Sequence, residues 1–137
     1  MDDNLPSREE ALEILKATGC SEEVIRHCKE VAKLAVEIGQ ACQEKGKEVK
    51  LSLIEIGALL HDIGRSQTHT IHHAVKGAEI AEAQDLPEEV ISIIKRHVGG
   101  GIPVKTADRL GWPKDIYIPL TLEEKIVSYA DKRIEEG

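Results

Sequence analysis

The sequence has 137 residues, is 41% hydrophobic and carries a formal net charge of −7. A chain of this length fits one domain with a sizeable core. The net charge and the scarcity of aromatic residues disfavour a protein that binds long nucleic acids. The acidic start, MDDNLPSREE, lacks the apolar segment of a signal peptide, and no apolar run approaches the roughly 18 residues of a membrane span. We therefore expect a cytoplasmic protein without a membrane segment.

Capping residues and helical spacing predict two helices in the first part of the chain. Ser7 with Glu10 forms a capping box, and the helix that it opens ends at Gly19. Ser21 opens a second helix, which ends at the polar sequence EKGKE. Its apolar residues alternate at spacings of four and three, which is typical of one inward face. They are Val24, Cys28, Val31, Ala35, Ile38 and Cys42.

The third predicted helix is apolar nearly all round, which favours a central place in the fold. Ser52 with Glu55 has the spacing of a second capping box, and Gly64 is placed to end this helix after Ile63.

The remaining chain continues the helical pattern. A fourth helix is expected from about Ile71 to Gln84, and a fifth from Pro87 to HVGGG. The segment KTADRLGWPKDIYIP favours a short helical turn and a loop, and Thr121 with Glu124 forms a capping box for the last helix. No alternating strand pattern competes. The sequence therefore predicts an all-α fold, a single-domain helical bundle.

Five polar residues lie on or beside the predicted apolar faces of separate helices, and Asp62 directly follows one of them. The six residues are His27, His61, Asp62, His73, His97 and Asp131. Each alone is more often a hydrogen-bonded core residue, and each would cost about 1–3 kcal/mol if it were buried unpaired. A shared cation would satisfy all of them at once. Imidazole and carboxylate favour a divalent transition metal (Mn, Fe, Co, Ni or Zn) over calcium, and the second oxygen of Asp62 could reach a second ion.

The motifs around these residues resemble the HD (HDIG) superfamily of metal-dependent phosphohydrolases. HDIGR at 61–65 follows His27 and precedes HAVKGAEIA at 73–81, IIKRHVGGG at 93–101 and LEEKIVSYADK at 122–132. The resemblance covers roughly residues 21–134. It implies that residues 1–137 form a single HD domain, a helical bundle of the HD-domain type with an added N-terminal helix.

The resemblance also implies the metal ligands. His27, His61, Asp62 and Asp131 correspond to the primary set, and His73 and His97 match the extra histidines of the two-metal subgroup. The C-terminal half is similar to HD-type diadenosine tetraphosphate hydrolases. The chain departs from the cyclic-di-GMP phosphodiesterases, because no GYP follows His97.

These residues predict hydrolysis of a small nucleotide or another phosphorylated metabolite by metal-activated water. Asp62 is the candidate for holding the attacking water, and Arg65 is the nearest cation for the substrate phosphate, with Arg96 and Lys76 next. The sequence does not distinguish a phosphomonoesterase from a phosphodiesterase or a pyrophosphohydrolase.

Two other functions fit the same residues. The first is a non-catalytic metal- or ligand-binding module, and the second is a di-iron oxygenase similar to the inositol-oxygenase branch. The sequence assigns no role to His69, His72 or the loop 98–120, and it leaves a homo-oligomer open.

Overall fold

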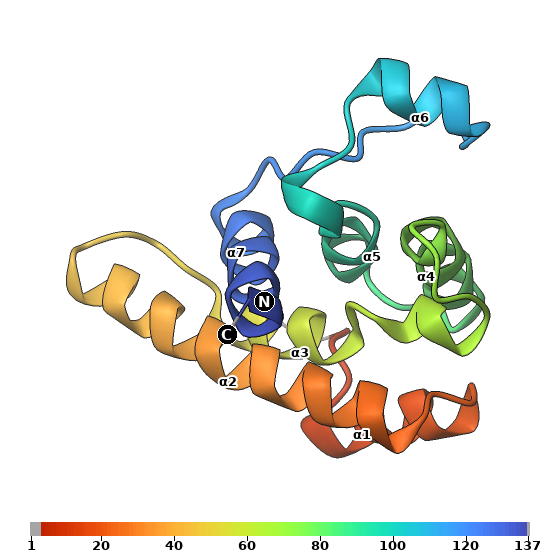
Figure 1. Ribbon diagram of the computed structural model, residues 1–137. Helices are drawn as coiled ribbons and strands as arrows, with labels where there is room; N and C mark the ends of the chain where they lie inside the picture. Colours follow the sequence, from red (N-terminus) through yellow and green to blue (C-terminus); the bar gives the residue numbers. More distant parts are fainter. Residues whose placement is uncertain (1–3, 137) are drawn as a thin grey trace.

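The computed structural model describes residues 4–136, and in that range all the regular elements are helices. An isolated antiparallel bridge pairs Ile102 with Tyr117. The helices are α1 (Arg8–Ala17), α2 (Glu22–Glu44), α3 (Leu51–Leu60), α4 (His73–Ala83), α5 (Glu88–Lys95), α6 (Val104–Leu110) and α7 (Leu122–Glu136), with short 3-10 helices η1 (Ile63–Ser66) and η2 (Val98–Gly100). The predicted all-α fold is confirmed (Figure 1). Within residues 4–136, no helix is long and apolar enough to cross a membrane.

Local capping fixes the starts of three helices as the sequence predicts. Ser7 and Glu10 exchange both hydrogen bonds of a capping box at α1. The side chain of Ser21 accepts from the backbone amide of Val24 at the start of α2. At α7, the amide of Glu124 donates to the Thr121 hydroxyl over 3.1 Å, and the amide of Thr121 donates to the Glu124 carboxylate over 3.3 Å.

The predicted capping box of the third helix is wrong. The N-cap of α3 is Lys50, without a side-chain capping bond. Glu55 instead forms an ion pair with Arg8 of α1, and the amide of Lys50 donates to Glu123 of α7. Contacts with neighbouring helices therefore fix this start, in place of the local pattern.

The end of α3 also differs from the prediction, because the helix stops at Leu60 and the chain tightens into η1. The carbonyl of Ala58 would accept from the amide of residue 62 if the helix continued. It accepts instead from His61, over 2.6 Å from Nδ1 of the ring and over 3.4 Å from the backbone amide. This side-chain bond takes the place of the next helical bond and leaves Asp62 outside the helix.

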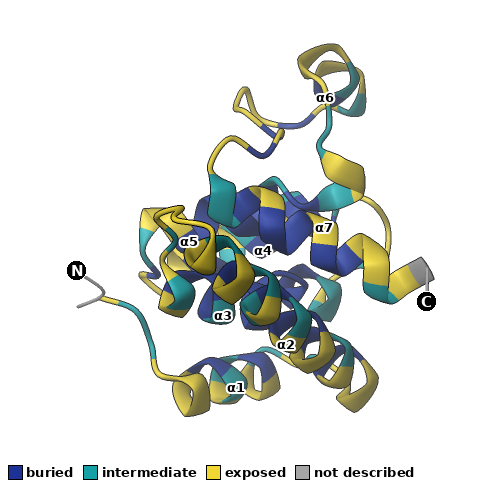
Figure 2. Ribbon diagram, turned by 90° about the vertical axis from the view of Figure 1, so that its left-hand side faces the viewer, coloured by how far each residue is buried: buried dark blue, intermediate teal, exposed yellow. Residues whose placement is uncertain are grey.

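The main core is aliphatic and surrounds α3, as its sequence predicts. Seven of the ten α3 residues are buried, and α1, α2, α5 and α7 all pack against this helix. Figure 2 shows buried residues on the inward faces of the bundle and exposed residues on the outer faces of α1 and α6. The last five residues of α3, 56–60, are all buried, so the end of this helix lies in the middle of the fold.

The segment around α6 stands apart from the bundle and has its own small core (Figure 1). Trp112 and Tyr117 pack there with Ala74 of α4. The indole Nε1 of Trp112 donates to Nδ1 of His72 over 2.8 Å, and Lys95 forms an ion pair of 2.6 Å with Asp115. These contacts fasten the segment beside the start of α4 and the end of α5.

The end of α5 and the start of α7 are joined by a nearly buried ion pair. Arg96 donates to both carboxylate oxygens of Glu124 at 3.1 Å, and the exposed fractions of the two side chains are 13% and 5%. The same carboxylate accepts from the amides of Leu120 and Thr121. Arg96 is therefore committed to a structural pair.

We predict that Glu124→Ala lowers the free energy of unfolding by about 3 kcal/mol, because it leaves the Arg96 guanidinium nearly buried and unpaired. Chemical denaturation with urea measures the change. Glu135→Ala removes an exposed carboxylate of the same helix and is expected to cost less than about 1 kcal/mol. Equal losses in the two variants would contradict the prediction.

Candidate metal centre

The structure brings all six predicted polar residues to one place inside the bundle. His61 and Asp62 follow the end of α3, with exposed fractions of 0% and 1%. The other four come from α2, the start of α4, the end of α5 and α7: His27, His73, His97 and Asp131.

Four of these residues form a first cluster. His27, His61, Asp62 and Asp131 each offer one ligand atom, and these atoms all lie within 4.8 Å of one another. Oδ1 of Asp131 lies 2.9 Å from Nε2 of His27 and 3.3 Å from Nε2 of His61. Oδ2 of Asp62 lies 3.4 and 3.5 Å from the same two nitrogens.

The other oxygen of Asp62 belongs to a second cluster. Oδ1 lies 3.2 Å from Nε2 of His73 and 3.3 Å from Nε2 of His97. The two Nε2 atoms are 3.0 Å apart. Asp62 therefore faces both clusters with one oxygen each, as its predicted bridging role requires.

Three of the histidines are held by the same local hydrogen bond. Nδ1 of His61, His73 and His97 lies 2.6–2.8 Å from the backbone carbonyl three residues earlier. A carbonyl only accepts, so each Nδ1 carries a proton, and Nε2 is the atom that each ring turns toward the clusters. At 3.0 Å, the lone pairs of His73 and His97 would repel each other unless a proton or a metal ion lies between them.

The charges of the site are strongly coupled. Burial opposes both charges, but the attraction between Asp62 and His61 holds the pKa of the carboxyl well below its usual range and the pKa of the imidazole well above its own. Burial also opposes the charge of Asp131, yet bonds from His27 and His61 lower its pKa. Burial lowers the pKa of His97. The two carboxylates are thus anionic at neutral pH, and a metal would compete with protons for the histidines.

One atom of the site lacks a hydrogen-bond partner. Among the buried side-chain nitrogens and oxygens of the described residues, Oδ1 of Asp62 is the one without such a bond. An unpaired carboxylate oxygen is costly to bury, and a cation on the side of His73 and His97 would satisfy it. Nitrogen and oxygen ligands in this arrangement fit one or two divalent transition-metal ions.

Arg65 is the cation nearest to the clusters. Its Nε lies 3.1 Å from Oδ2 of Asp62, and its NH1 donates to the carbonyl of His69. Arg65 and His69 line an open pocket of about 530 Å³ together with His27 and Asp62. The other two candidate cations are paired with carboxylates outside the clusters. Arg96 pairs with Glu124, and the exposed Lys76 lies 3.6 Å from Glu79.

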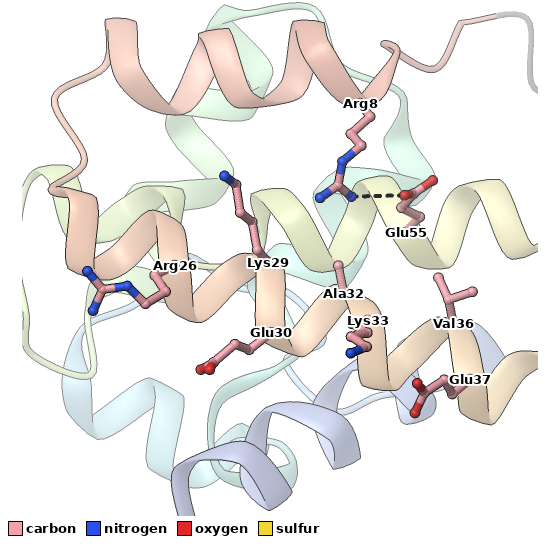
Figure 3. Close-up of a pocket in the computed structure, with 9 residues that line it drawn as sticks. All are labelled: Arg8, Arg26, Lys29, Glu30, Ala32, Lys33, Val36, Glu37 and Glu55. Carbon is pink, nitrogen blue, oxygen red and sulfur yellow. Dashed lines mark hydrogen bonds and ion pairs between the residues drawn. The ribbon is translucent and has the colours of Figure 1, made fainter.

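A separate groove between α1, α2 and α3 holds none of the clustered residues. Its volume is about 510 Å³, and Figure 3 shows its lining, where Arg8 and Glu55 form an ion pair. Its other charged side chains lie on one stretch of α2: Arg26, Lys29, Glu30, Lys33 and Glu37. Mixed surface charge without a histidine makes it a weaker candidate site than the pocket at Asp62.

A close approach between two glycines positions His73. A Cβ atom added to Gly64 would lie 1.9 Å from the carbonyl oxygen of His73 and 2.7 Å from the amide of Gly77. A Cβ added to Gly77 would lie 3.2 Å from the amide of Gly64. The fold therefore places η1 directly against the start of α4.

Comparison with known proteins gives the family. The model of the HD domain family matches residues 24–134, and the chain therefore belongs to this family. An uncharacterized protein of Methanocaldococcus jannaschii is 49% identical over 92% of the chain and 74% of that protein. A tRNA (cytidine(56)-2'-O)-methyltransferase of Thermoplasma volcanium is 42% identical over 93% of the chain, which spans only 36% of the methyltransferase.

More distant matches share the domain or the fold. Ribonuclease Y of Aquifex aeolicus is 37% identical over 58% of the chain and 14% of that protein. The HD domain of the Listeria monocytogenes phosphodiesterase PgpH, in complex with cyclic-di-AMP, superposes with a TM-score of 0.71 at 18% identity, over 93% of the chain and 71% of that domain. The predicted HD-domain fold is thereby confirmed. A specific similarity to diadenosine tetraphosphate hydrolases is not among these findings.

We predict that Gly64→Ala destabilises the fold by about 3 kcal/mol, because backbone atoms of α4 cannot make room for a methyl group as a flexible side chain does. Thermal unfolding of the metal-free protein measures the loss. Gly46→Ala serves as the control, since its added Cβ meets nothing within 4 Å and only its φ of 87° is unfavourable, at about 1 kcal/mol. A Gly64 variant no less stable than the Gly46 variant would overturn this account.

Proposed function

We propose that the protein is a metal-dependent phosphohydrolase that acts on a small nucleotide or another phosphorylated metabolite. The observation that carries the proposal is the buried Asp62 carboxylate, which faces a different set of histidines with each oxygen. A purely structural metal site needs one closed set of ligands. A carboxylate shared between two adjoining sets is instead suited to two ions that act on one phosphate.

The proposed ligands follow the two clusters. His27, His61, Asp62 and Asp131 hold the first ion, and Asp62, His73 and His97 hold the second. Metal ions bound there supply the water activation and the neutralisation of phosphate charge that hydrolysis needs at neutral pH.

The chain's own groups then orient the reaction. Asp62 accepts a hydrogen bond from the attacking water and so directs it toward the phosphorus atom. Arg65 is held by Asp62 through Nε, which leaves its NH2 group available to donate to a phosphate oxygen in the pocket. The side chain of Arg65 is 23% exposed, as a group that meets a substrate must be.

The relatives support a phosphate ester of a nucleotide as the substrate. Those named ribonuclease Y and the fold neighbour named a phosphodiesterase favour a phosphodiester, and the methyltransferase relatives carry the same domain beside an activity on tRNA. The bond is therefore proposed to lie next to a nucleotide, either free or at the end of an RNA chain. The pocket beside Asp62 is open enough to admit such an end.

We predict that Asp62→Ala stays folded but loses hydrolysis, because it removes both the shared ligand and the acceptor for water. The experiment tests the purified protein, loaded with Mn²⁺, Co²⁺, Ni²⁺, Fe²⁺ or Zn²⁺, on a panel of nucleotides, dinucleotides and simple phosphate esters. The expected fall in kcat/KM is at least about a thousandfold, and circular dichroism confirms the helical fold. If the metal-loaded wild type hydrolyses none of these esters, or if Asp62→Ala keeps its activity, the proposed function is wrong.

We predict that His97→Ala binds about half as much metal as the wild type, because it removes a ligand of the second cluster only. Metal analysis after equilibrium dialysis measures the stoichiometry. His69→Ala is the control, since His69 lines the pocket beside Asp62 but belongs to neither cluster. Unchanged stoichiometry in His97→Ala, together with weaker substrate binding, would instead assign His97 to the substrate phosphate in a one-metal site.

A further inference from the structure

A smaller hollow lies on α7, on the face beside the one that carries Asp131. Its volume is about 290 Å³. One wall is formed by Ile118 and Pro119, and the other by Lys125, Tyr129 and Lys132 of α7. None of these residues belongs to the two metal clusters.

The hollow adjoins the metal centre through α7. Lys132 directly follows Asp131, and Ser128, which also lines the hollow, donates from its hydroxyl to the carbonyl of His97 over 3.1 Å. The helix rises 1.5 Å per residue, so the lining residues of α7 lie within about 9 Å of Asp131 along its axis. Successive side chains are about 100° apart, so Lys132 points to the face beside that of Asp131.

Tyr129 is the exposed aromatic residue of the chain. Its exposed fraction is 56%, whereas Trp112 and Tyr117 are exposed by only 7% and 4%. Lys125 and Lys132 flank it, four residues before and three residues after, on the same side of the helix. Among the residues that the structure describes, neither lysine forms an ion pair, although the chain carries a net charge of −7.

We propose that this hollow is a nucleotide subsite, where the base lies between Tyr129 and the wall of Ile118 and Pro119 and the lysines bind its phosphate. An aromatic ring stacks on any base, and lysine attracts phosphate without requiring a fixed geometry. A volume of about 290 Å³ is at the lower end for ligand sites and suits one nucleotide. The subsite rests on the proposed function for its role, which is to hold the nucleotide next to the phosphate that is hydrolysed.

Binding of AMP to the metal-free protein tests the subsite without requiring activity. We expect Tyr129→Ala to weaken AMP binding by at least about fivefold, because stacking on the ring is lost, and Tyr129→Phe to retain it. Lys132→Ala is expected to weaken AMP binding and to reduce its dependence on salt. Arg133→Ala, on the same helix but lining a different groove with Leu34, is expected to bind like the wild type. Titration followed by NMR measures all five proteins.

Three results would overturn the subsite. The first is a wild type that binds AMP no more tightly than inorganic phosphate, and the second is a Tyr129→Ala variant with unchanged AMP affinity. The third is a fall in molecular mass for Tyr129→Ala in sedimentation with unchanged AMP binding, which would make this face an interface between two copies.

A second experiment distinguishes a free nucleotide from a chain end. The metal-loaded enzyme is given a dinucleotide and a five-residue RNA, each compared with bis(p-nitrophenyl) phosphate, which has no base. The preference is the kcat/KM for each nucleotide substrate divided by the kcat/KM for bis(p-nitrophenyl) phosphate. For the substrate whose base occupies the subsite, either the dinucleotide or the RNA, we expect this ratio to fall about tenfold in Tyr129→Ala. If no ester is hydrolysed but AMP binding still depends on Tyr129, the proposed function fails and the subsite stands. An unchanged preference would contradict the subsite.

Discussion

The burial of the Asp62 carboxylate is the constraint on which the rest of the site depends. A carboxylate exposed by only 1% would cost several kcal/mol if it were left alone, so the surrounding structure must supply positive charge. Arg65 and the imidazole of His61 meet Oδ2, while Oδ1 faces the nitrogens of His73 and His97 without a hydrogen bond. The centre of the bundle is thus organised around a charge that the protein alone satisfies only in part.

Helix ends are what make this arrangement possible. His61 is the C-cap of α3, His73 is the first residue of α4, and His97 follows the C-cap of α5. Ala58 and Ile94 lie in the last turns of α3 and α5, where backbone carbonyls lack their usual helical partners and can accept from the Nδ1 of a histidine. The carbonyl of Thr70 precedes α4 and accepts from both the amide and the Nδ1 of His73. The same carbonyl-to-imidazole bond therefore recurs three times and orients three Nε2 atoms. Glycine packing between η1 and α4 then brings two of these helix ends together.

Features encoded locally were predictable from the sequence, and features that depend on distant contacts were not. The capping boxes at Ser7 and Thr121 involve residues three apart, and both formed as predicted. The pattern at Ser52 has the same spacing, but it failed because Glu55 pairs with a different helix. Arg96 likewise has its partner 28 residues away, which no local spacing reveals. The six clustered residues were predictable because a family motif orders them, although their arrangement around one carboxylate required the fold.

The charges around Asp131 favour one orientation of the proposed nucleotide relative to the metal centre. The pocket beside Asp62 places Arg65 near the clusters but carries Glu23 and Glu135 in its lining, and these carboxylates repel an anionic chain. The hollow on the neighbouring face of α7 carries Lys125 and Lys132. A nucleotide whose phosphate meets Arg65 and the metal centre is therefore favoured to continue along α7 toward the lysines and Tyr129. The net charge of the whole chain is consistent with this route, because a single nucleotide responds to the charges within about 10 Å of it and is screened from the rest.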